Sequence, residues 1–233
     1  MSAEQERRKQ QAAELAVKQI EESMIVGLGT GSTADLVTKR LAEQVAEGFD
    51  VIGVPTSRKT AELAGSLGIP LRDLQDVAHI DLTIDGADEI QPGTLFALKG
   101  AGGALLREKL VALDSSKVIL VVDDTKIVDL IGNNFAVPVE VVQFGWRVPA
   151  RGLGALGATI EMRLDPVTGQ PFVTDNDNYV LDAAFGPIGD PNQLSRRVKE
   201  ITGVIEHGLF VGVVDEVIVA GSDGTATLTP DVL

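Results

Sequence analysis

The fold of this chain is most clearly indicated by Ile25-Val-Gly-Leu-Gly-Thr-Gly-Ser-Thr-Ala34. A short apolar run leads into three alternating glycines and two hydroxyl residues, and a helical pattern follows from Asp35 to about Val45. Glycines let the backbone approach a ligand closely, and Ser32 or Thr33 can cap the helix. The free N–H groups and the dipole of a helix start favour an anion such as a phosphate. This stretch therefore predicts a strand, a turn and a helix, with an anion site at the turn.

This glycine turn does not match the common nucleotide-binding loops. A G-x-G-x-x-G fingerprint that starts at Gly27 requires glycine at position 32, which is Ser32, and no G-K-[ST] of a Walker A loop follows. A strand, turn and helix that only require tight packing would show the same pattern, so this alternative stays open.

A second informative stretch is Ile80-Asp-Leu-Thr-Ile-Asp-Gly-Ala-Asp-Glu89. Its apolar residues alternate as in a strand, and Asp85 falls where the strand ends. Ligands of open α/β sheets bind beyond the carboxyl ends of the strands, so Asp85 and Asp88 are expected at the crevice. The three acids could instead bind a divalent metal, and Glu89 could be a solvated acid in an Asx-type turn.

The third stretch is Lys99-Gly-Ala-Gly-Gly-Ala-Leu-Leu-Arg-Glu-Lys109, a lysine and a glycine cluster that lead into a helix. The predicted helix is apolar on most sides and is therefore expected to be buried. Burial raises the pKa of a carboxyl group towards neutrality, as a general base requires, so Glu108 is a candidate base. Alternatively, Glu108 pairs with Arg107, Lys109 or another cation.

Together these stretches resemble the type A ribose-5-phosphate isomerase family. The matching motifs are Gly29–Thr33, Asp85–Glu89, the Lys99–Lys109 block and Val121-Val-Asp-Asp-Thr-Lys126, where Thr125 stands in place of the serine of many members. Three further segments also look like those of the family: 137–141, 173–176 and 206–210. The resemblance runs from roughly Lys9 to Asp223.

The resemblance implies an aldose–ketose isomerase of the non-oxidative pentose phosphate pathway, which interconverts ribose 5-phosphate and ribulose 5-phosphate through an enediolate. Glu108 would be the base that serves both carbons, and Asp85 would assist ring opening and shuttle a hydroxyl proton. Lys99, Asp88 and the amides of 100–102 would stabilise the enediolate oxygens. Ser32 and Thr33 with Lys126 would hold the phosphate, with Lys9 as a further candidate. The expected substrate contacts are Thr30, Gly31, Ser32, Thr33, Gly86, Ala87, Gly100, Ala101, Gly102 and Lys126.

The resemblance also implies no metal and no organic cofactor, because the carbonyl group itself acidifies the neighbouring C–H. It implies a homodimer or a homotetramer. A sugar-phosphate-sensing regulator and a CoA-transferase-like enzyme are the alternatives of other classes. A preference for a CoA ester would identify the transferase, and turnover of a sugar phosphate would separate an isomerase from a sensor.

Composition limits the partners further. The chain of 233 residues has 34 acidic and 20 basic residues, a formal charge of −14, which argues against broad binding to nucleic acid or anionic membranes. The absence of cysteine excludes disulfides and thiolate zinc sites. The N-terminus reads as a charged amphipathic helix, from Ala3 to about Glu22, and no stretch approaches the roughly 20 apolar residues of a membrane span. A cytoplasmic protein is expected.

The fold class expected is α/β, a Rossmann-like parallel sheet with an inserted smaller α+β, ferredoxin-like unit. The predicted strands are 24–29, 50–54, 80–85, 117–122, 158–164, 171–174, 178–183, 213–219 and 225–229. The predicted helices are 33–47, 57–67, 102–113, 144–157 and 191–202, the last capped by Asp190 with Pro191 at its first position. The catalytic unit would comprise 1–131 and 207–233, and the insert 132–206 would be a plausible oligomer interface.

Some features are expected to be structural only. Gly152–Gly157 matches G-x-G-x-x-G literally, but the stretch behind it alternates like a strand, so no nucleotide site is expected there. His79 and His207 are each isolated, and a structural role is expected for both. Trp146 is expected to pack in or beside the second unit.

Overall fold

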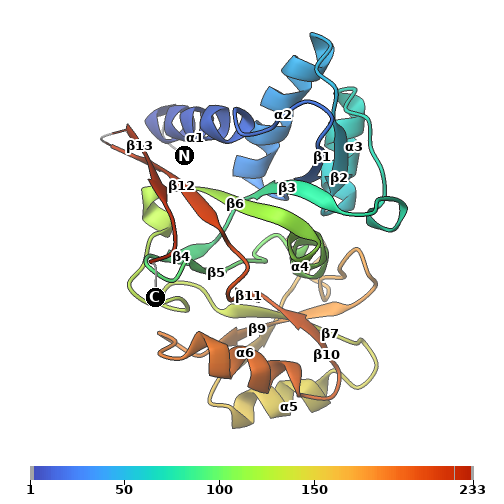
Figure 1. Cartoon of the computed structure of the whole chain (residues 1–233). Coiled ribbons are helices and arrows are strands. Elements are labelled where there is room, and N and C mark those ends of the chain that lie inside the picture. Colours follow the sequence, from blue (N-terminus) through green and yellow to red (C-terminus); the bar gives the residue numbers. More distant parts are fainter. Residues whose placement is uncertain (1–2, 223, 232–233) are drawn as a thin grey trace.

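The computed structural model describes residues 3–222 and 224–231 and contains a central parallel sheet (Figure 1). Its strand order is β13-β12-β6-β3-β1-β2, and only β13 runs antiparallel to its neighbour. The strands are β1 (Ile25–Leu28), β2 (Ile52–Pro55), β3 (Ile80–Asp85), β6 (Ser115–Asp123), β12 (Glu216–Gly221) and β13 (Gly224–Leu228). The continuous burial of β6 from Val118 to Asp123 is typical of a parallel strand that is covered on both faces.

Helices cover both faces of this sheet. The helices are α1 (Ala3–Val17), α2 (Ser32–Ala46), α3 (Arg58–Ser66) and α4 (Leu105–Leu113). Figure 1 shows α1 and α2 on one face of the sheet and α4 on the other. The apolar side chains of α1 and α2 pack on the first face, and Val111 and Ala112 of α4 pack on the second. No helix in the described part of the chain has the length and apolar character that a membrane span requires.

A second, antiparallel sheet has the strand order β10-β7-β9-β8. Its strands are β7 (Val137–Val141), β8 (Thr159–Met162), β9 (Tyr179–Ala184) and β10 (Val204–His207). The helices of this part of the chain are α5 (Arg147–Ala155) and α6 (Pro191–Lys199). Figure 1 shows α5 and α6 on the face of this sheet that points away from the parallel sheet. The chain then returns to the parallel sheet through β12 and β13, as predicted.

A small third sheet lies between the other two in Figure 1 and was not predicted. It pairs β4 (Glu89–Gln91), β5 (Phe96–Leu98) and β11 (Leu209–Phe210). Two short 3-10 helices, η1 (Leu74–Asp76) and η2 (Asp124–Lys126), complete the structure. Strands of two or three residues are too short to show an alternating pattern, which explains why the sequence did not reveal this sheet.

The α/β class and most predicted elements are confirmed, but several boundaries differ. The first helix ends at Val17 rather than near Glu22, and α4 begins at Leu105 rather than at 102. The segment 171–174 is not a strand and makes only isolated bridges, from Pro171 and Val173. The exact unit boundaries of 131/132 and 206/207 stay a prediction, and residues 1–2, Asp223 and 232–233 lie outside the described residues.

The helix caps were predicted with mixed success. Asp190 caps α6, since its side chain accepts a hydrogen bond from the N–H of Gln193, and Pro191 is the first helical residue as predicted. The prediction that Ser32 or Thr33 caps α2 is wrong, because the helix already begins at Ser32. Gly31 occupies the cap position, with a φ of 113° and no side-chain cap.

The prediction that α4 is buried on most sides is also wrong. The face that carries Glu108 is buried, but the side chains of Leu110 and Leu113 are 48% and 65% exposed. The literal G-x-G-x-x-G of 152–157 lies largely within α5 and precedes β8, so it does not form a strand-to-helix loop, as expected. Trp146 packs against the core of the second sheet, also as expected.

Glu89 differs most from its expected environment. The interpretation as a solvated turn acid is wrong, because its side chain is fully buried and accepts hydrogen bonds from two N–H groups. Oε2 lies 2.5 Å from the N of Gly132, and Oε1 lies 2.6 Å from the N of Asn134. This carboxylate ties β4 to the loop that leads into β7.

Replacement of this carboxylate should therefore destabilise the fold. In Glu89→Gln an NH₂ group replaces one carboxylate oxygen and cannot accept the hydrogen bond from the N–H that faced this oxygen. The loss of an acceptor for this buried N–H lowers the free energy of unfolding by about 1–3 kcal/mol. Urea denaturation measures the change, with Glu22→Gln at an exposed position as the control. Equal stability of Glu89→Gln and the control would contradict this role of Glu89.

Candidate active site

A pocket of about 250 Å³ opens at the carboxyl ends of β1, β3 and β6, where ligands of open α/β sheets bind. It is lined by Lys9, Thr30, Gly31, Ser32, Thr33, Gly86, Ala87, Asp88, Lys99, Gly100, Ala101, Gly102, Glu108 and Lys126. These residues come from five separate parts of the sequence: Lys9, 30–33, 86–88, 99–108 and Lys126. Every site residue expected from the sequence is among them, except for Asp85.

The ammonium group of Lys99 lies between two buried carboxylates. Its Nζ is 3.1 Å from Oδ2 of Asp85 and 3.5 Å from Oε2 of Glu108, and it donates a 2.6 Å hydrogen bond to the carbonyl oxygen of Gly86. All three charged side chains are at most 5% exposed. The cation that faces Glu108 is therefore Lys99, rather than its sequence neighbours Arg107 or Lys109.

Burial raises the pKa of Glu108 to about 8. The charge of Lys99 opposes this shift, and the carboxylates of Asp85 and Asp88 reinforce it. Within the described residues, Oε2 of Glu108 is buried without a hydrogen-bond partner. A carboxylate with such a pKa at a pocket can exchange a proton near neutral pH.

The other two members of this cluster are better compensated. Burial disfavours the ammonium form of Lys99, but the surrounding carboxylates outweigh burial and raise its pKa. Burial also raises the pKa of Asp85, yet this carboxylate accepts hydrogen bonds from the N–H groups of Thr30 and Gly86 in addition to its ion pair. Because Glu108 lacks such donors, we assign the readily exchanged proton to Glu108.

Two glycines explain how the backbone approaches this cluster. A Cβ atom on Gly29 would lie 2.2 Å from Oδ1 of Asp85, so only glycine leaves room for that carboxylate. Gly100 has a φ of 107°, which favours glycine, and a Cβ there would lie 2.9 Å from Cβ of Leu105. The glycine pattern of the sequence thus reflects close packing around the site.

The other end of the pocket is suited to an anion. Ser32 and Thr33 open α2, whose N-terminal N–H groups and dipole favour negative charge. Two further cations line the same cavity: Lys126, with Nζ 4.9 Å from the ring centroid of Phe135, and Lys9, with Nζ 3.4 Å from Oδ2 of Asp123. The pocket therefore combines a carboxylate and ammonium cluster with an anion-binding end.

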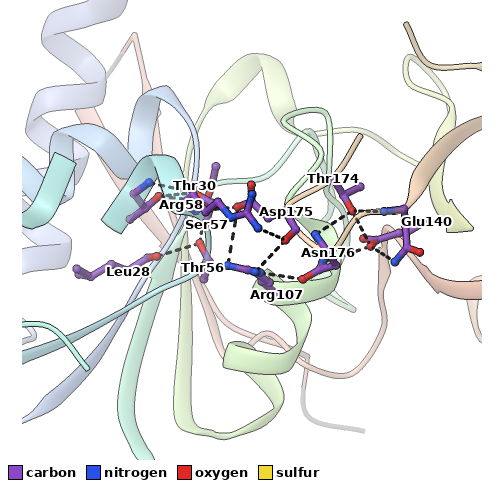
Figure 2. Close-up of polar contacts among 12 residues, drawn as sticks. Leu28, Thr30, Thr56, Ser57, Arg58, Arg107, Glu140, Thr174, Asp175 and Asn176 are labelled. Carbon is purple, nitrogen blue, oxygen red and sulfur yellow. Dashed lines mark hydrogen bonds and ion pairs between the residues drawn. The ribbon is translucent and has the colours of Figure 1, made fainter. Parts of the chain in front are cut away.

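A hydroxyl cluster behind Thr30 was not predicted. Oγ1 of Thr30 lies 2.8 Å from both Oγ1 of Thr56 and Oγ of Ser57 (Figure 2). It also lies 3.1 Å from Oγ1 of Thr60. Oγ1 of Thr56 also donates to the carbonyl oxygen of Leu28. These contacts hold the turn after β1 against the start of α3.

Figure 2 also shows how the loop that precedes β9 contacts α3 and α4. A carboxylate oxygen of Asp175 accepts from the first N–H of α3, that of Arg58, at 2.7 Å. Arg107 donates through Nη2 to the carbonyl oxygen of Asp175 and through Nε to Oδ1 of Asn176. Since Arg107 directly precedes Glu108, the loop before β9 helps to set the position of the Glu108 carboxylate. The sequence did not predict these contacts and indicated only that 173–176 looks like a segment of the family.

On the far side of α4, Lys109 joins the helix to β10. Its Nζ lies 2.8 Å from Oε1 of Glu206 and 2.5 Å from the carbonyl oxygen of His207. Burial first, and then the charge of Lys109, lower the pKa of His207 to about 4, so its imidazole is neutral at pH 7. Neither this histidine nor His79, which contacts Ser116, lines the pocket, in agreement with the structural role expected for both.

The acidic cluster does not form a metal site. Within 3–222 and 224–231, no group of three or more histidine, cysteine, aspartate or glutamate side chains is arranged to hold a metal ion. Instead, Asp85 faces Lys99, Glu89 is buried among backbone N–H groups, and Oδ2 of Asp88 accepts a 2.9 Å hydrogen bond from the N–H of Ala101.

Comparison with known proteins identifies the family. The model of the family described as ribose 5-phosphate isomerase A (phosphoriboisomerase A) matches residues 52–224. The ribose-5-phosphate isomerase A of Thermomicrobium roseum is 50% identical over 223 residues, which cover 96% of this chain and 94% of the relative. That of Synechococcus sp. (strain JA-3-3Ab) is 49% identical over 221 residues, with 94% and 96% covered.

Solved structures agree with this result. The ribose 5-phosphate isomerase A of Methanocaldococcus jannaschii superposes with a TM-score of 0.92 at 38% identity, covering 96% of this chain and 99% of that one. A D-ribose-5-phosphate isomerase in complex with phospho-erythronic acid gives a TM-score of 0.93 at 38% identity, covering 96% and 98%. On the extent of these matches, this chain belongs to the ribose 5-phosphate isomerase A family.

Proposed function

We propose that this protein interconverts ribose 5-phosphate and ribulose 5-phosphate through an enediolate, as the non-oxidative pentose phosphate pathway requires. The observation that carries the proposal is the buried carboxylate of Glu108, with its pKa raised to about 8 and one oxygen without a hydrogen-bond partner among the described residues. The family match and the related isomerase that holds phospho-erythronic acid support the same reaction.

Isomerisation moves a proton between neighbouring carbons. Ionised Glu108 would remove the proton from C2 of the open-chain aldose, and the resulting carboxylic acid would return a proton to C1 of the enediolate. One base can serve both carbons because they are adjacent. A pKa near the working pH suits a group that must accept the proton and then donate it.

The negative charge of the enediolate requires donors that are already in place. The ammonium of Lys99 lies 3.5 Å from Oε2 of Glu108, so it would sit beside the developing oxyanion. The amides of Gly100, Ala101 and Gly102 line the same wall, and Asp88 would orient the substrate hydroxyl groups. No metal or organic cofactor enters this scheme, since the carbonyl group itself acidifies the C–H bond.

Asp85 is assigned to ring opening and to the transfer of a hydroxyl proton. It does not line the pocket and is 2% exposed, so this assignment rests on the family resemblance and on its ion pair with Lys99. At the other end, Ser32, Thr33 and Lys126 would hold the phosphate, and Lys9 would add a further positive charge. The remaining lining residues, Thr30, Gly31, Gly86 and Ala87, would contact the substrate between these ends.

The isomerase proposal is favoured over the regulator and the CoA-transferase-like enzyme because the relatives compared above are named isomerases. The proposal includes a cytoplasmic homodimer or homotetramer as the working form, with no nucleic-acid or membrane partner. Light scattering of the purified protein tests the oligomeric state.

Removal of the base should abolish turnover and preserve binding. In Glu108→Gln the side chain keeps its shape but cannot accept the proton, so kcat should fall by roughly 10²–10⁴-fold or more, while phospho-erythronate still binds. The assay is ketose formation from ribose 5-phosphate with EDTA present, beside the wild type and Glu22→Gln. Near-normal turnover of Glu108→Gln would refute the base assignment, and a wild type that is inactive only with EDTA would reopen the acidic cluster as a metal site.

Removal of a phosphate contact should affect KM more than kcat. Lys126→Ala deletes a cation of the pocket that would hold the phosphate, the part of the substrate remote from the reacting carbons. KM for ribose 5-phosphate should therefore rise roughly 10- to 100-fold, the effect of one lost charged hydrogen bond. Steady-state kinetics measure both constants, with Lys18→Ala at the exposed position directly after α1 as the matched control. A large fall in kcat at unchanged KM would exclude a phosphate-binding role for Lys126.

A further inference from the structure

Arg163 directly follows β8 of the second sheet, yet it contacts the glycine loop of the pocket. Its Nη1 donates to the carbonyl oxygen of Gly100 at 2.7 Å and to that of Ala101 at 3.0 Å. Its Nε and Nη2 both bond to the carboxylate of Asp182 on β9. One guanidinium group is thus fixed by a carboxylate on one side and holds two consecutive peptide groups on the other.

The geometry of the peptide bond converts this contact into an effect on the pocket. In a trans peptide the C=O and the following N–H point in opposite directions. A group that binds the carbonyls of Gly100 and Ala101 therefore directs the N–H groups of Ala101 and Gly102 away from itself. The N–H of Ala101 does point to the pocket side, since it donates to Oδ2 of Asp88, which lines the cavity.

The N–H groups of Ala101 and Gly102 differ in whether they already have a hydrogen-bond acceptor. Ala101 already has an acceptor in Asp88, whereas the N–H of Gly102 has none in the part of the chain that the structure describes. Gly102 lines the cavity, so its N–H is available to a substrate oxygen. A positive charge on the carbonyl side also polarises each peptide group and strengthens the N–H as a donor.

We propose that Arg163 is a positioning residue for isomerisation, which acts by holding the peptide groups of 100–102 so that the N–H of Gly102 faces an enediolate oxygen while that of Ala101 holds Asp88 at the pocket. This inference rests on the proposed function for the identity of the reaction. The inference gives a residue of the second sheet a role in isomerisation, whereas the sequence analysis placed all catalytic residues in the unit of 1–131 and 207–233. Asp182 keeps the guanidinium group in place and offsets its charge.

The glycine loop needs such a support. Gly100 and Gly103 both have a positive φ, 107° and 79°, and apart from Arg163 the loop is held by the hydrogen bond from the N–H of Gly103 to the carbonyl oxygen of Gly100 and by the contact between Ala101 and Asp88. Glycine-rich backbone has many alternative conformations. Without the guanidinium group, the two N–H donors would be less well ordered when charge develops on the substrate, and a misplaced donor stabilises the transition state less.

The test compares Arg163→Met with Arg163→Lys, Asp182→Asn and a matched control. The control is Lys199→Met, because Lys199 also pairs with a carboxylate of the second sheet and donates to a backbone carbonyl, but does not touch the pocket. Each variant is assayed for kcat and KM with ribose 5-phosphate. Calorimetry measures the binding of phospho-erythronate, whose carboxylate stands in for the enediolate oxygens, and of inorganic phosphate alone.

We expect kcat of Arg163→Met to fall by about 10- to 100-fold, somewhat less than the loss of a direct oxyanion donor. The affinity for phospho-erythronate should fall by a similar factor, whereas KM and the affinity for inorganic phosphate should change by less than about threefold, because Arg163 does not itself line the pocket and the inference gives it no part in holding the phosphate. Arg163→Lys and Asp182→Asn should fall between Arg163→Met and the wild type, and Lys199→Met should match the wild type.

Two results would overturn the inference. One is a kcat of Arg163→Met within about threefold of the wild type. The other is a parallel loss of kcat, phosphate affinity and melting temperature, which would show that Arg163 only stabilises the fold. If the wild type itself does not isomerise ribose 5-phosphate, the proposed function fails, and the inference is then decided by the affinities for phospho-erythronate and phosphate, which need no turnover.

Discussion

One ammonium group buried between two carboxylates is the interaction on which this site depends. Lys99 brings together Asp85 from the end of β3 and Glu108 from α4, with Nζ–O distances of 3.1 and 3.5 Å. One positive charge cannot fully compensate two buried negative charges, so the cluster favours the uptake of a proton. Removing Lys99 would leave both carboxylates without a buried counter-charge. Breaking even one buried ion pair in this way lowers stability by about 3–5 kcal/mol. The same arrangement thus links the position of α4 to the pKa of Glu108.

The surrounding structure holds α4 through three consecutive charged residues, each with a different partner. Successive residues of an α-helix project about 100° apart, so 107, 108 and 109 face different neighbours. Arg107 contacts the loop before β9 (Figure 2), Glu108 faces Lys99, and Lys109 contacts β10. The centroid of the Phe210 ring lies 5.4 Å from Nζ of Lys99 and 5.0 Å from Nζ of Lys109, so the ring contacts both lysines. The second sheet and the loop before β9 therefore support α4.

The parts of the site that could be predicted from the sequence are those encoded by local patterns. The turn after β1, residues 86–88 directly after β3 and the glycine loop before α4 each lie within about ten consecutive residues, and the structure brings them into one pocket. Partners that are distant in the sequence could not be predicted: Lys109 with Glu206, and Arg163 with the loop at 100–101. The alternative that Glu89 is a solvated acid in an Asx-type turn was wrong, because no local pattern reveals the two N–H groups that Glu89 meets in the core. The exposed face of α4 was missed since an apolar residue does not guarantee burial.

Burial raises the pKa of Glu108, and the single ammonium group of Lys99 compensates this effect only in part. Carboxylate infrared or ¹³C NMR titration of the wild type, with Glu108→Gln subtracted, measures this pKa without reference to turnover. The structure predicts a midpoint at about pH 8, with Glu108 protonated below and ionised above it. A midpoint near the ordinary glutamate value of about 4.3 would show that Lys99 compensates the carboxylate fully, and would contradict this account of the base.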